Sequence, residues 1–385
     1  MPPVLYLTPG VFDMGGIARY GRYQIDALRT LAGPLDVRVV SMLGPEPGGF
    51  ETPFPVDFFA GGNRRRHKAL FTLASLAMLA PRSLYWSAHL HYAPLAFAYA
   101  KATRGIPIVN IYGLEVWSNP PRASQAVLPH CHVVSDCHAT LDYAVAKGLV
   151  DPDKATVIWD PVDLERFHFA PPDPELAQRL GLALDGRFRV MFLGRLAKGA
   201  MHKGPDALLR AFARARLPHN AELVIAGSGD RLSDLQELAR NLGLGDRVRF
   251  LGRIAEADLA GFYRLASIFV LVSRRYEGGG EGIPLTPLEA AACGVPIVVG
   301  NEDGSREAVV EGENGFVVPS RDEDALVAVL QRCSQDAELL RRLGEGAAAR
   351  ARTHFSYERF LREHEAFLAK LTETATNAAS RPAGT

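Results

Sequence analysis

The feature of this 385-residue sequence that most constrains its fold is an alternation of short apolar strands with helical stretches, which occurs twice along the chain. In the first half, residues 4–7 read as a buried strand, and the apolar residues from Ile17 to Leu28 keep helical spacing. The pattern begins again at residues 189–193. Such alternation produces parallel sheets with helices on both faces. We therefore expect an α/β fold with two Rossmann-like domains around a central cleft.

A run of prolines separates the two halves, at Pro161, Pro171, Pro172 and Pro174. The length allows two domains of ordinary size, and an apolar content of 48% is enough for two cores. We expect an N-terminal domain of residues 1–165 and a C-terminal domain of residues 166–354. Residues 372–385 are small and polar and are expected to form a flexible tail. The strands expected are 4–7, 37–40, 106–111, 131–135, 155–158, 189–193, 221–226, 248–251, 268–272 and 296–299.

The segment from Glu281 to Glu289 carries the most chemical information. Glycines surround Glu281, and Glu289 lies in an apolar run that Gly294 ends. A backbone this bare can approach a ligand closely, and the start of the helix behind it offers unpaired N–H groups to an anion. Pro284 and Pro287 exclude a continuous helix that carries both glutamates. The two carboxylates must therefore face a site from different elements.

Each glutamate also has a purely structural interpretation. Thr286 to Glu289 reads Thr-Pro-Leu-Glu, which is the pattern of a capping box with proline at the first helical position. In that interpretation Glu289 only satisfies backbone donors, and Glu281 is a solvated loop acid. These residues alone do not decide between the structural and the functional interpretation.

Two basic residues follow the strand at 189–193. Arg195 stands in Gly-Arg-Leu, and Lys203 stands in His-Lys-Gly at the start of the next helix. Ligands of open α/β sheets bind at the carboxyl ends of the strands. An arginine fork and a lysine point charge together could neutralise a diphosphate. Either residue taken singly is more often a solvated surface charge.

In their order along the chain, these motifs and the Gly-Val-Pro of residues 294–296 resemble those of the retaining glycosyltransferases of family 4, the glycosyl transferases group 1, which share the GT-B fold. The resemblance covers nearly the whole chain and is strongest over residues 190–319. It implies that a last helix, at about 355–371, crosses back onto the first domain. It also implies a nucleotide-diphosphate sugar of UDP or GDP type as donor, a sugar or lipid-linked acceptor, and no cofactor.

The resemblance assigns roles to single residues. Arg195 and Lys203 would hold the diphosphate, and Glu281 would lie beside the donor sugar; these three are the expected catalytic residues. Retention could proceed by front-face attack or through a covalent intermediate on Glu281, and we expect positioning to be the role of that glutamate. Glu289 would hold the ribose hydroxyls, and backbone groups of Ile254 would contact the base. The expected donor site comprises Gly15, Gly16, Gly194, Arg195, Lys203, Ile254, Glu281, Gly282, Ile283, Pro284, Leu285 and Glu289.

The acceptor side rests on residues of the first half. His91 lies near an expected strand end. The family commonly reads His-Gly-x-Glu after the fourth strand, whereas this chain reads Tyr-Gly-Leu-Glu from Tyr112 to Glu115. The unperturbed pKa of a phenol is too high for Tyr112 to shuttle protons near neutral pH as a histidine would. Its hydroxyl could still position a sugar, and we expect His91, Tyr112 and Glu115 on the acceptor side.

The formal net charge is zero, and this argues against nucleic acid as a partner. The charges are nevertheless unevenly distributed along the chain. Between Asp57 and Glu115 the sequence has no acidic residue. A surface of one sign would favour an anionic membrane or a phosphorylated acceptor. As an alternative, residues 69–80 are apolar on nearly every side, which is typical of a buried helix. The basic residues at the start of this stretch are Arg64, Arg65, Arg66 and Lys68.

The sequence shows neither a metal-binding motif nor a signal peptide for export. Four cysteines show no metal-type spacing and are too few for a disulfide scaffold. Asp151 and Asp153 have an Asp-x-Asp spacing, but in a turn-like linker at the wrong place. We expect no metal and metal-independent activity. The chain runs from its first residues into a strand without a signal peptide, and its longest apolar run is too short to span a bilayer. We expect a cytoplasmic location, peripheral on the inner membrane face.

These observations predict a retaining hexosyltransferase, which moves a sugar from a nucleotide-diphosphate sugar to an acceptor hydroxyl in polysaccharide, glycolipid or glycoconjugate biosynthesis. Two alternatives stay open. A nucleotide-sugar epimerase would use a similar two-domain cleft but would need acid–base histidines and carboxylates around the sugar. A non-catalytic protein that binds nucleotide sugars on the same fold would explain Tyr112.

Overall fold

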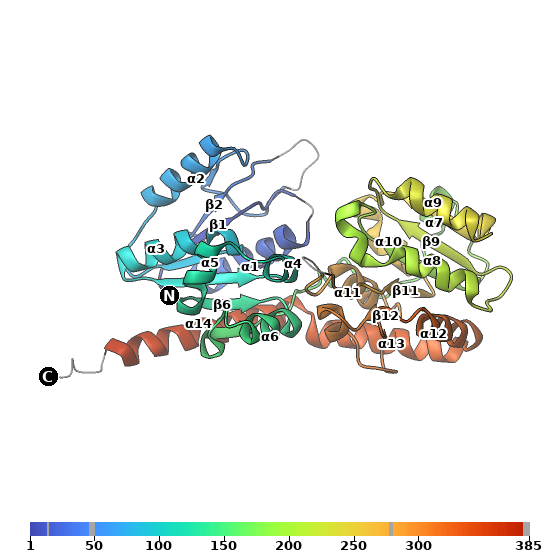
Figure 1. Ribbon diagram of the computed structural model, residues 1–385. Helices are drawn as coiled ribbons and strands as arrows, with labels where there is room; N and C mark the ends of the chain where they lie inside the picture. The colour runs from blue at the N-terminus through green and yellow to red at the C-terminus, as the bar shows by residue number, and fades with distance from the viewer. Residues whose placement is uncertain (14, 46–50, 277–279, 380–385) are drawn as a thin grey trace. The chain divides into compact units, whose positions relative to one another are not determined.

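The computed structural model describes residues 1–13, 15–45, 51–276 and 280–379. The chain forms two compact units, each built around its own parallel sheet (Figure 1). Unit 1 consists of Met1–Pro161 together with Tyr357–Thr385, and unit 2 consists of Val162–Ser356.

Unit 1 contains a seven-stranded sheet in the order β3-β2-β1-β4-β5-β6-β7, as far as the described residues go. Every neighbouring pair is parallel. The strands are β1 (Val4–Thr8), β2 (Val37–Ser41), β3 (Phe58–Phe59), β4 (Leu84–Ser87), β5 (Ile106–Ile111), β6 (His132–Ser135) and β7 (Ala155–Val157). The helices are α1 (Gly16–Ala32), α2 (Arg65–Ala77), α3 (Ala93–Thr103), α4 (Gly113–Trp117), α5 (Arg122–Val127), α6 (His138–Ala146) and α14 (Tyr357–Ala379), with 3-10 turns η1 (Leu90–Tyr92), η2 (Leu128–His130) and η3 (Pro152–Lys154).

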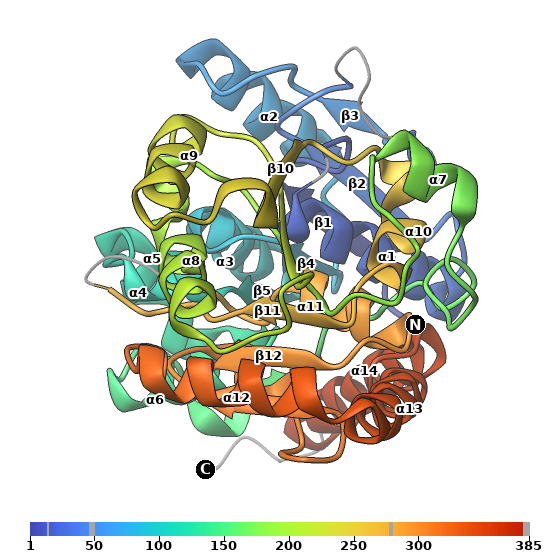
Figure 2. The ribbon, with the colours of Figure 1, turned by 90° about the vertical axis from the view of Figure 1, so that its right-hand side faces the viewer.

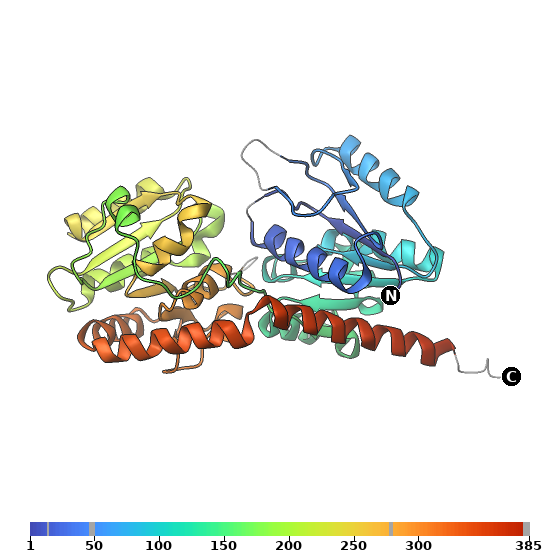
Figure 3. The ribbon, with the colours of Figure 1, turned by 180° about the vertical axis from the view of Figure 1, so that it is seen from behind.

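Successive residues of β1 serve opposite faces of this sheet, as the two-residue period of a strand requires. Tyr6 belongs to a core cluster that includes residues of α1 and α14, such as Ile25 and Phe360. Leu5 belongs to a second cluster with Phe71 of α2 and residues of α3. Figures 1 and 3 show α2 and α3 on one face and α1 and α14 on the other. Because both faces are covered, the strands read as continuous apolar runs.

Helix α14 continues to Ala379, so residues 372–379, part of the expected flexible tail, are helical. Residues 380–385 lie outside the described residues. Across the described parts of the chain, none of the helices has both the length and the apolar character needed to cross a membrane.

Unit 2 contains a six-stranded sheet in the order β10-β9-β8-β11-β12-β13, again entirely parallel across the described residues. Its strands are β8 (Arg189–Leu193), β9 (Glu222–Ala226), β10 (Val248–Gly252), β11 (Ile268–Leu271), β12 (Ile297–Gly300) and β13 (Gly315–Val318). Its helices are α7 (Pro174–Arg179), α8 (Pro205–Arg214), α9 (Leu232–Asn241), α10 (Leu259–Arg264), α11 (Leu285–Ala292), α12 (Glu323–Gln335) and α13 (Ala337–His354), with 3-10 turns η4 (Lys198–Lys203), η5 (Gly245–Arg247), η6 (Glu256–Asp258) and η7 (Gly304–Ala308).

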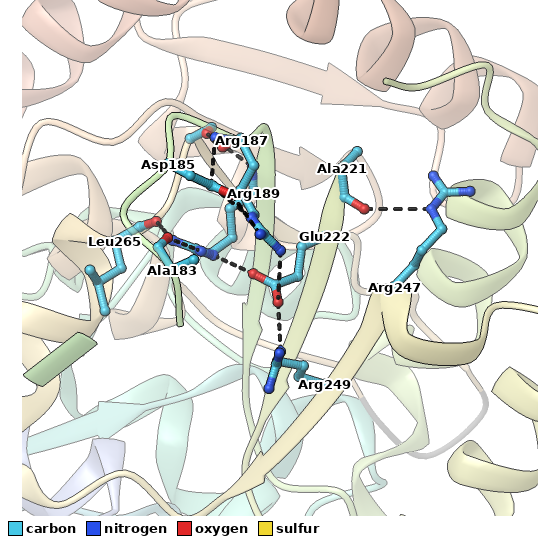
Figure 4. Close-up of polar contacts among 10 residues, drawn as sticks. Ala183, Asp185, Arg187, Arg189, Ala221, Glu222, Arg247, Arg249 and Leu265 are labelled. Carbon is cyan, nitrogen blue, oxygen red and sulfur yellow. Dashed lines mark hydrogen bonds and ion pairs between the residues drawn. The ribbon is translucent and has the colours of Figure 1, made fainter. Parts of the chain in front are cut away.

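Helices α8 and α12 lie side by side in unit 2 (Figure 2), and an ion pair joins them, with the Arg210 Nε atom 2.6 Å from Glu323 Oε1. A buried charge network ties the amino-terminal ends of three neighbouring strands together (Figure 4). Glu222 of β9 accepts hydrogen bonds of 2.7 Å from both Arg189 of β8 and Arg249 of β10. Removal of Glu222 would leave the buried charge of Arg189 without its ion pair, which is strongly destabilising. The network fixes the sheet at the edge opposite the carboxyl ends of its strands.

Both sheets reverse their strand order at one point, between β1 and β4 in unit 1 and between β8 and β11 in unit 2. The chain leaves the two strands at such a point in opposite directions, so the loops after them diverge and leave room for a ligand at the carboxyl edge. In unit 2 these loops carry Lys203 and Glu281. In unit 1 they carry Gly15 and His91. The residues that the sequence motifs single out therefore lie in the loops at the two points of strand-order reversal.

Candidate active site

The loops after β8 and β11 contact each other at one point, directly beside the end of β11, before they diverge. Gly204 has a φ of 70° and precedes α8. A Cβ atom at Gly204 would lie 2.4 Å from the carbonyl oxygen of Val272, the residue after β11. Only a glycine permits both this left-handed backbone conformation and this contact. The Lys-Gly motif is therefore required for the two loops to meet.

Three side chains meet where these loops converge. The ammonium of Lys203 lies 2.5 Å from Glu281 Oε1. His202 Nε2 contacts the same carboxylate oxygen. The His202 side chain is 3% exposed and that of Lys203 is 13% exposed, while Glu281 retains 20% exposure. Water thus reaches the carboxylate better than its two partners, and Glu281 is the member of the cluster most accessible to a ligand.

The electrostatic balance keeps Glu281 ionised. Burial by itself would raise the pKa of the Glu281 carboxyl, but the charge of Lys203 and the hydrogen bond from His202 outweigh burial and lower the pKa to about 2. Glu281 therefore carries a negative charge at any physiological pH. A carboxylate in this state can stabilise positive charge that develops on a reacting sugar.

His202 is a site residue for which sequence reasoning gave no role. Its ring stacks on Tyr276, with the ring centroids 5.9 Å apart. Its Nδ1 atom is buried and finds no hydrogen-bond partner among the described residues. The available signal was its place next to Lys203 in the same motif. The ring supports the Glu281 carboxylate from the interior, while Lys203 approaches it from the loop.

Arg195 takes a different position from Lys203. It is exposed, and no ion pair joins it to another described residue. The Lys203 side chain passes over Gly194, the residue before Arg195, since a Cβ atom at Gly194 would lie 3.0 Å from Lys203 Cδ. The structure therefore brings Lys203 together with Glu281, and leaves Arg195 beside them with its guanidinium in solvent.

The capping-box interpretation of Glu289 is wrong. Helix α11 begins at Leu285 with Pro284 as its N-cap, so Thr286 lies inside the helix and Glu289 is beyond its first turn. The Glu289 side chain instead points into unit 2, where it is buried and accepts a hydrogen bond of 2.7 Å from the Tyr263 hydroxyl. The proposed binding of ribose by Glu289 stays a prediction.

The remaining donor-site residues of unit 2 border these two loops. Gly282 and Leu285 are half-buried, while Ile283 and Pro284 are buried at the start of α11. Residues 277–279 of the glycine-rich loop lie outside the described residues. Ile254 is buried two residues after β10. Gly227, after β9, has a structural explanation: its φ is 130°, and a Cβ atom there would lie 1.8 Å from the carbonyl oxygen of Gly194.

The two glycines of unit 1 stand at the start of α1. Gly15 is the N-cap and Gly16 the first helical residue, and both are exposed. No acidic residue lies in the first turn of the helix. The backbone N–H of Gly15 donates a 2.8 Å hydrogen bond to the carboxylate of Asp13. An anionic ligand at this point would have to displace the Asp13 carboxylate.

Tyr112 is directed into the interior of unit 1. It is buried, and its hydroxyl accepts a hydrogen bond of 3.1 Å from Asn110, which also donates to Gln24. Burial raises the pKa of Tyr112 well above its ordinary value. The hydroxyl is thus part of a structural network, which argues against its use as a direct contact to the acceptor.

Glu115 holds together the loops after β4 and β5. Its buried carboxylate accepts backbone hydrogen bonds of 3.1 Å from Tyr112 and 3.3 Å from Leu90. His89 Nε2 lies 2.8 Å from the same carboxylate, and His91 lies next to His89, with their Nδ1 atoms 3.0 Å apart. The structure therefore brings His91 and Glu115 into one cluster through His89.

Comparison with known proteins gives consistent results for the second half of the chain. Residues 177–350 match the family model described as glycosyl transferases group 1. The chain is 35% identical over 229 residues to a D-inositol 3-phosphate glycosyltransferase of Streptomyces bingchenggensis, which covers 57% of this chain and 48% of that protein. It is 37% identical over 176 residues to a GDP-mannose-dependent alpha-(1-6)-phosphatidylinositol monomannoside mannosyltransferase of Mycolicibacterium smegmatis, which covers 44% of each. The matched part of the chain thus spans about half the length of these curated relatives.

Solved structures extend the likeness to both units. Anabaena Alr3699/HepE in complex with UDP superposes with a TM-score of 0.80 at 19% identity, over 96% of this chain and 100% of that chain. Sucrose-phosphate synthase from Thermosynechococcus elongatus superposes with a TM-score of 0.76 at 20% identity, over 97% of this chain and 100% of that chain. At this low sequence identity, the TM-scores show a shared fold and nothing further.

Proposed function

We propose that the chain is a retaining glycosyltransferase that moves a hexose from a nucleotide-diphosphate sugar to an acceptor hydroxyl, because residues 177–350 match the family model of the group 1 glycosyl transferases and the chain has the GT-B fold. The observation that carries the proposal is the cluster of Lys203, His202 and Glu281 at the strand-order reversal of unit 2. In such a cluster, the Lys203 ammonium can bind the leaving diphosphate, and the Glu281 carboxylate can stabilise the sugar from which the diphosphate departs.

The chemistry follows from the charges. As the bond between sugar and diphosphate breaks, negative charge grows on the phosphate oxygens and positive charge on the anomeric carbon. Lys203 and Arg195 would stabilise the phosphate, aided by the free N–H groups at the start of α11. The ionised Glu281 would stabilise the sugar. Both front-face attack and a covalent intermediate on Glu281 are compatible with these contacts, and we expect Glu281 to position and stabilise the sugar.

The donor is proposed to be of UDP or GDP type, since a solved neighbour binds UDP and a relative is named as GDP-mannose-dependent. Glu289 would contact the ribose and Ile254 the base. The acceptor is proposed to be a sugar or a lipid-linked sugar. His91 remains the acceptor-side candidate with an exposed ring.

The test begins with thermal unfolding of the full chain across nucleotide diphosphates and their sugars, because a ligand of the folded state raises the melting temperature. The stabilising donor is then incubated with sugars, inositol phosphate and phosphatidylinositol. Free nucleotide diphosphate together with a glycosylated acceptor is the expected result. An isomerised sugar would instead establish epimerisation, and binding of donor without turnover across the acceptors would contradict transfer.

Transfer should need no divalent ion, because Lys203 and Arg195 supply the positive charge that a metal would otherwise bring to the diphosphate. We expect the rate in excess chelator to stay close to the rate without chelator. The assay compares initial rates of nucleotide release before and after chelation. Activity that disappears in chelator and returns with magnesium or manganese would contradict this prediction.

We further propose that α2 contacts an anionic membrane surface, which would make the protein peripheral on the inner face. The alternative of a buried helix is wrong, because only Phe71 and Ser75 of α2 are buried. Leu73 is 63% exposed, and Leu70 and Leu76 are 47% and 44% exposed. These three leucines recur every third residue and so share one side of the helix. Four basic residues at its start, Arg64, Arg65, Arg66 and Lys68, are exposed beside them.

Exposed leucines next to a basic turn suit the boundary between acyl chains and anionic headgroups. The full chain should sediment with vesicles that contain phosphatidylglycerol and not with pure phosphatidylcholine. Replacement of the four basic residues by Ser, or of the three leucines by Ser, should each reduce sedimentation several-fold. Leu35→Ser, at an 89% exposed leucine outside α2, is the matched control. A wild-type chain that stays in the supernatant with anionic vesicles would refute membrane contact.

A further inference from the structure

A turn after β4 places two histidine rings against each other. His89 is the N-cap of η1, and His91 lies two residues later within this turn. Their ring centroids are 4.8 Å apart, and the two Nδ1 atoms are 3.0 Å apart. Together with Glu115 they form a group whose ligand atoms all lie within 4.8 Å of one another. The whole group belongs to unit 1.

We propose that His89 and His91 bind one divalent transition-metal ion of the Zn²⁺ class through their Nδ1 atoms, and that Glu115 orients His89 from behind. Imidazole is a preferred ligand of zinc, copper and nickel. This site is separate from the donor site proposed above, and it can be tested without nucleotide or acceptor.

Glu115 prepares His89 for this role by selecting its tautomer. The carboxylate lies 2.8 Å from His89 Nε2, so this nitrogen carries the proton and donates it to the carboxylate. The Nδ1 atom is then unprotonated, and its lone pair accepts the 3.3 Å hydrogen bond from the backbone N–H of His91. A metal ion at this site would take the place of that hydrogen bond. A carboxylate behind a ligand histidine is the usual second layer of a metal site.

The spacing of the two nitrogens is close to that of a metal-bound pair. Two imidazole nitrogens at about 2.0–2.1 Å from a tetrahedral ion are separated by about 3.3 Å. A small rotation of the exposed His91 ring would open the observed 3.0 Å to this value. The exposure of His91 leaves the other coordination positions to water, so the site would be open.

A hydrogen bond from His91 Nδ1–H to His89 Nδ1 would give the same short distance without a metal, and the experiment separates the two. The untagged full chain is stripped with chelator and titrated with Zn²⁺ by calorimetry at pH 7.5. We expect saturable binding of one ion per chain. His91→Ala should weaken binding at least tenfold, and Glu115→Gln should weaken it by about 10- to 100-fold. His219→Ala, at an exposed histidine of unit 2, should leave it unchanged.

Because Glu115 also accepts backbone hydrogen bonds, its variant is compared only if circular dichroism shows a native fold. His91→Ala removes an exposed ring and is the decisive variant. Copper(II) loaded in place of zinc should show hyperfine coupling to two nitrogens by electron paramagnetic resonance. The proposal is overturned if the wild-type chain shows no saturable binding, or if His91→Ala binds zinc as tightly as the wild type.

Discussion

Glu281→Gln should slow sugar transfer by about a hundredfold or more and leave the affinity for free nucleotide diphosphate close to that of the wild type. The loss of one preorganised charge that faces a developing charge costs about two to three orders of magnitude in rate. The free nucleotide diphosphate lacks the sugar, so it makes no contact that depends on this carboxylate. In the free protein Glu281 also engages Lys203. The neutral variant leaves Lys203 available to the diphosphate, so affinity has no reason to fall.

Glu289→Gln is the matched comparison, because the same change is made in the other glutamate of the motif. Glu289 is buried and lies beyond the first turn of α11, so a role in capping does not explain it. If it holds the ribose, loss of its charge weakens hydrogen bonds to the nucleotide, and affinity should fall about tenfold or more. The two variants should thus separate, one in turnover and one in binding. Near-wild-type kinetics in both would mean that the motif has been misread.

Acid unfolding provides a check that does not depend on activity. The pKa of Glu281 in the folded chain is lowered to about 2, from an ordinary value of 4.5. Its ionised form therefore stabilises the fold fully above pH 4.5, and this contribution is lost as the pH falls toward 2. Glu281→Gln should lack this part of the acid sensitivity. Unfolding curves for the two proteins should converge as the pH approaches 2.

The strands were largely predictable because burial on both faces makes their apolar runs continuous. Residues 189–193 and 106–111 were placed at the positions that the structure confirms. Three strands are missing from the expected list: β3 has only two residues, β13 begins with a glycine, which carries no apolar signal, and only the end of β4, near His91, was expected. The exposure of α2 was not decidable from composition. An apolar helix has the same sequence pattern whether its leucines are exposed or are covered by another element.

The site was predictable only in part, for a similar reason. Local motifs singled out Lys203 and Glu281, but their contact depends on the pairing of β8 with β11, which joins residues 78 positions apart. His202 takes part in the same contact, and its only signal in the sequence was its place next to Lys203. The capping box failed because the pattern of Thr286 to Glu289 fits a helix start, while the chain enters α11 at Leu285, immediately after Pro284. A short pattern cannot reveal which of several allowed positions begins the helix.

Replacement of both Arg195 and Lys203 by Ala should reduce the affinity for nucleotide diphosphate by a hundredfold or more. Each charge-assisted hydrogen bond to a phosphate contributes about 1.5–3 kcal/mol, and about 1.4 kcal/mol corresponds to a tenfold change. The single variants should not be equal. Lys203 is largely buried in the cluster with Glu281, whereas Arg195 is exposed and its charge is screened by water. We expect Lys203→Ala to account for most of the loss.

Calorimetry with a nucleoside diphosphate, and with the nucleoside alone, distinguishes a phosphate contact from general damage. The double variant should bind the nucleoside as the wild type does, because neither side chain is expected to reach the base or the ribose. Lys198→Ala is the matched control, since Lys198 is an exposed lysine of the same turn η4. Thermal unfolding checks the fold of the double variant. We expect the variant to fold, because His202 still contacts Glu281 when Lys203 is removed. Unchanged affinity for the diphosphate in a folded double variant would show that neither residue binds the diphosphate. The expectation of metal-independent transfer, which depends on their positive charge, would then lose its support.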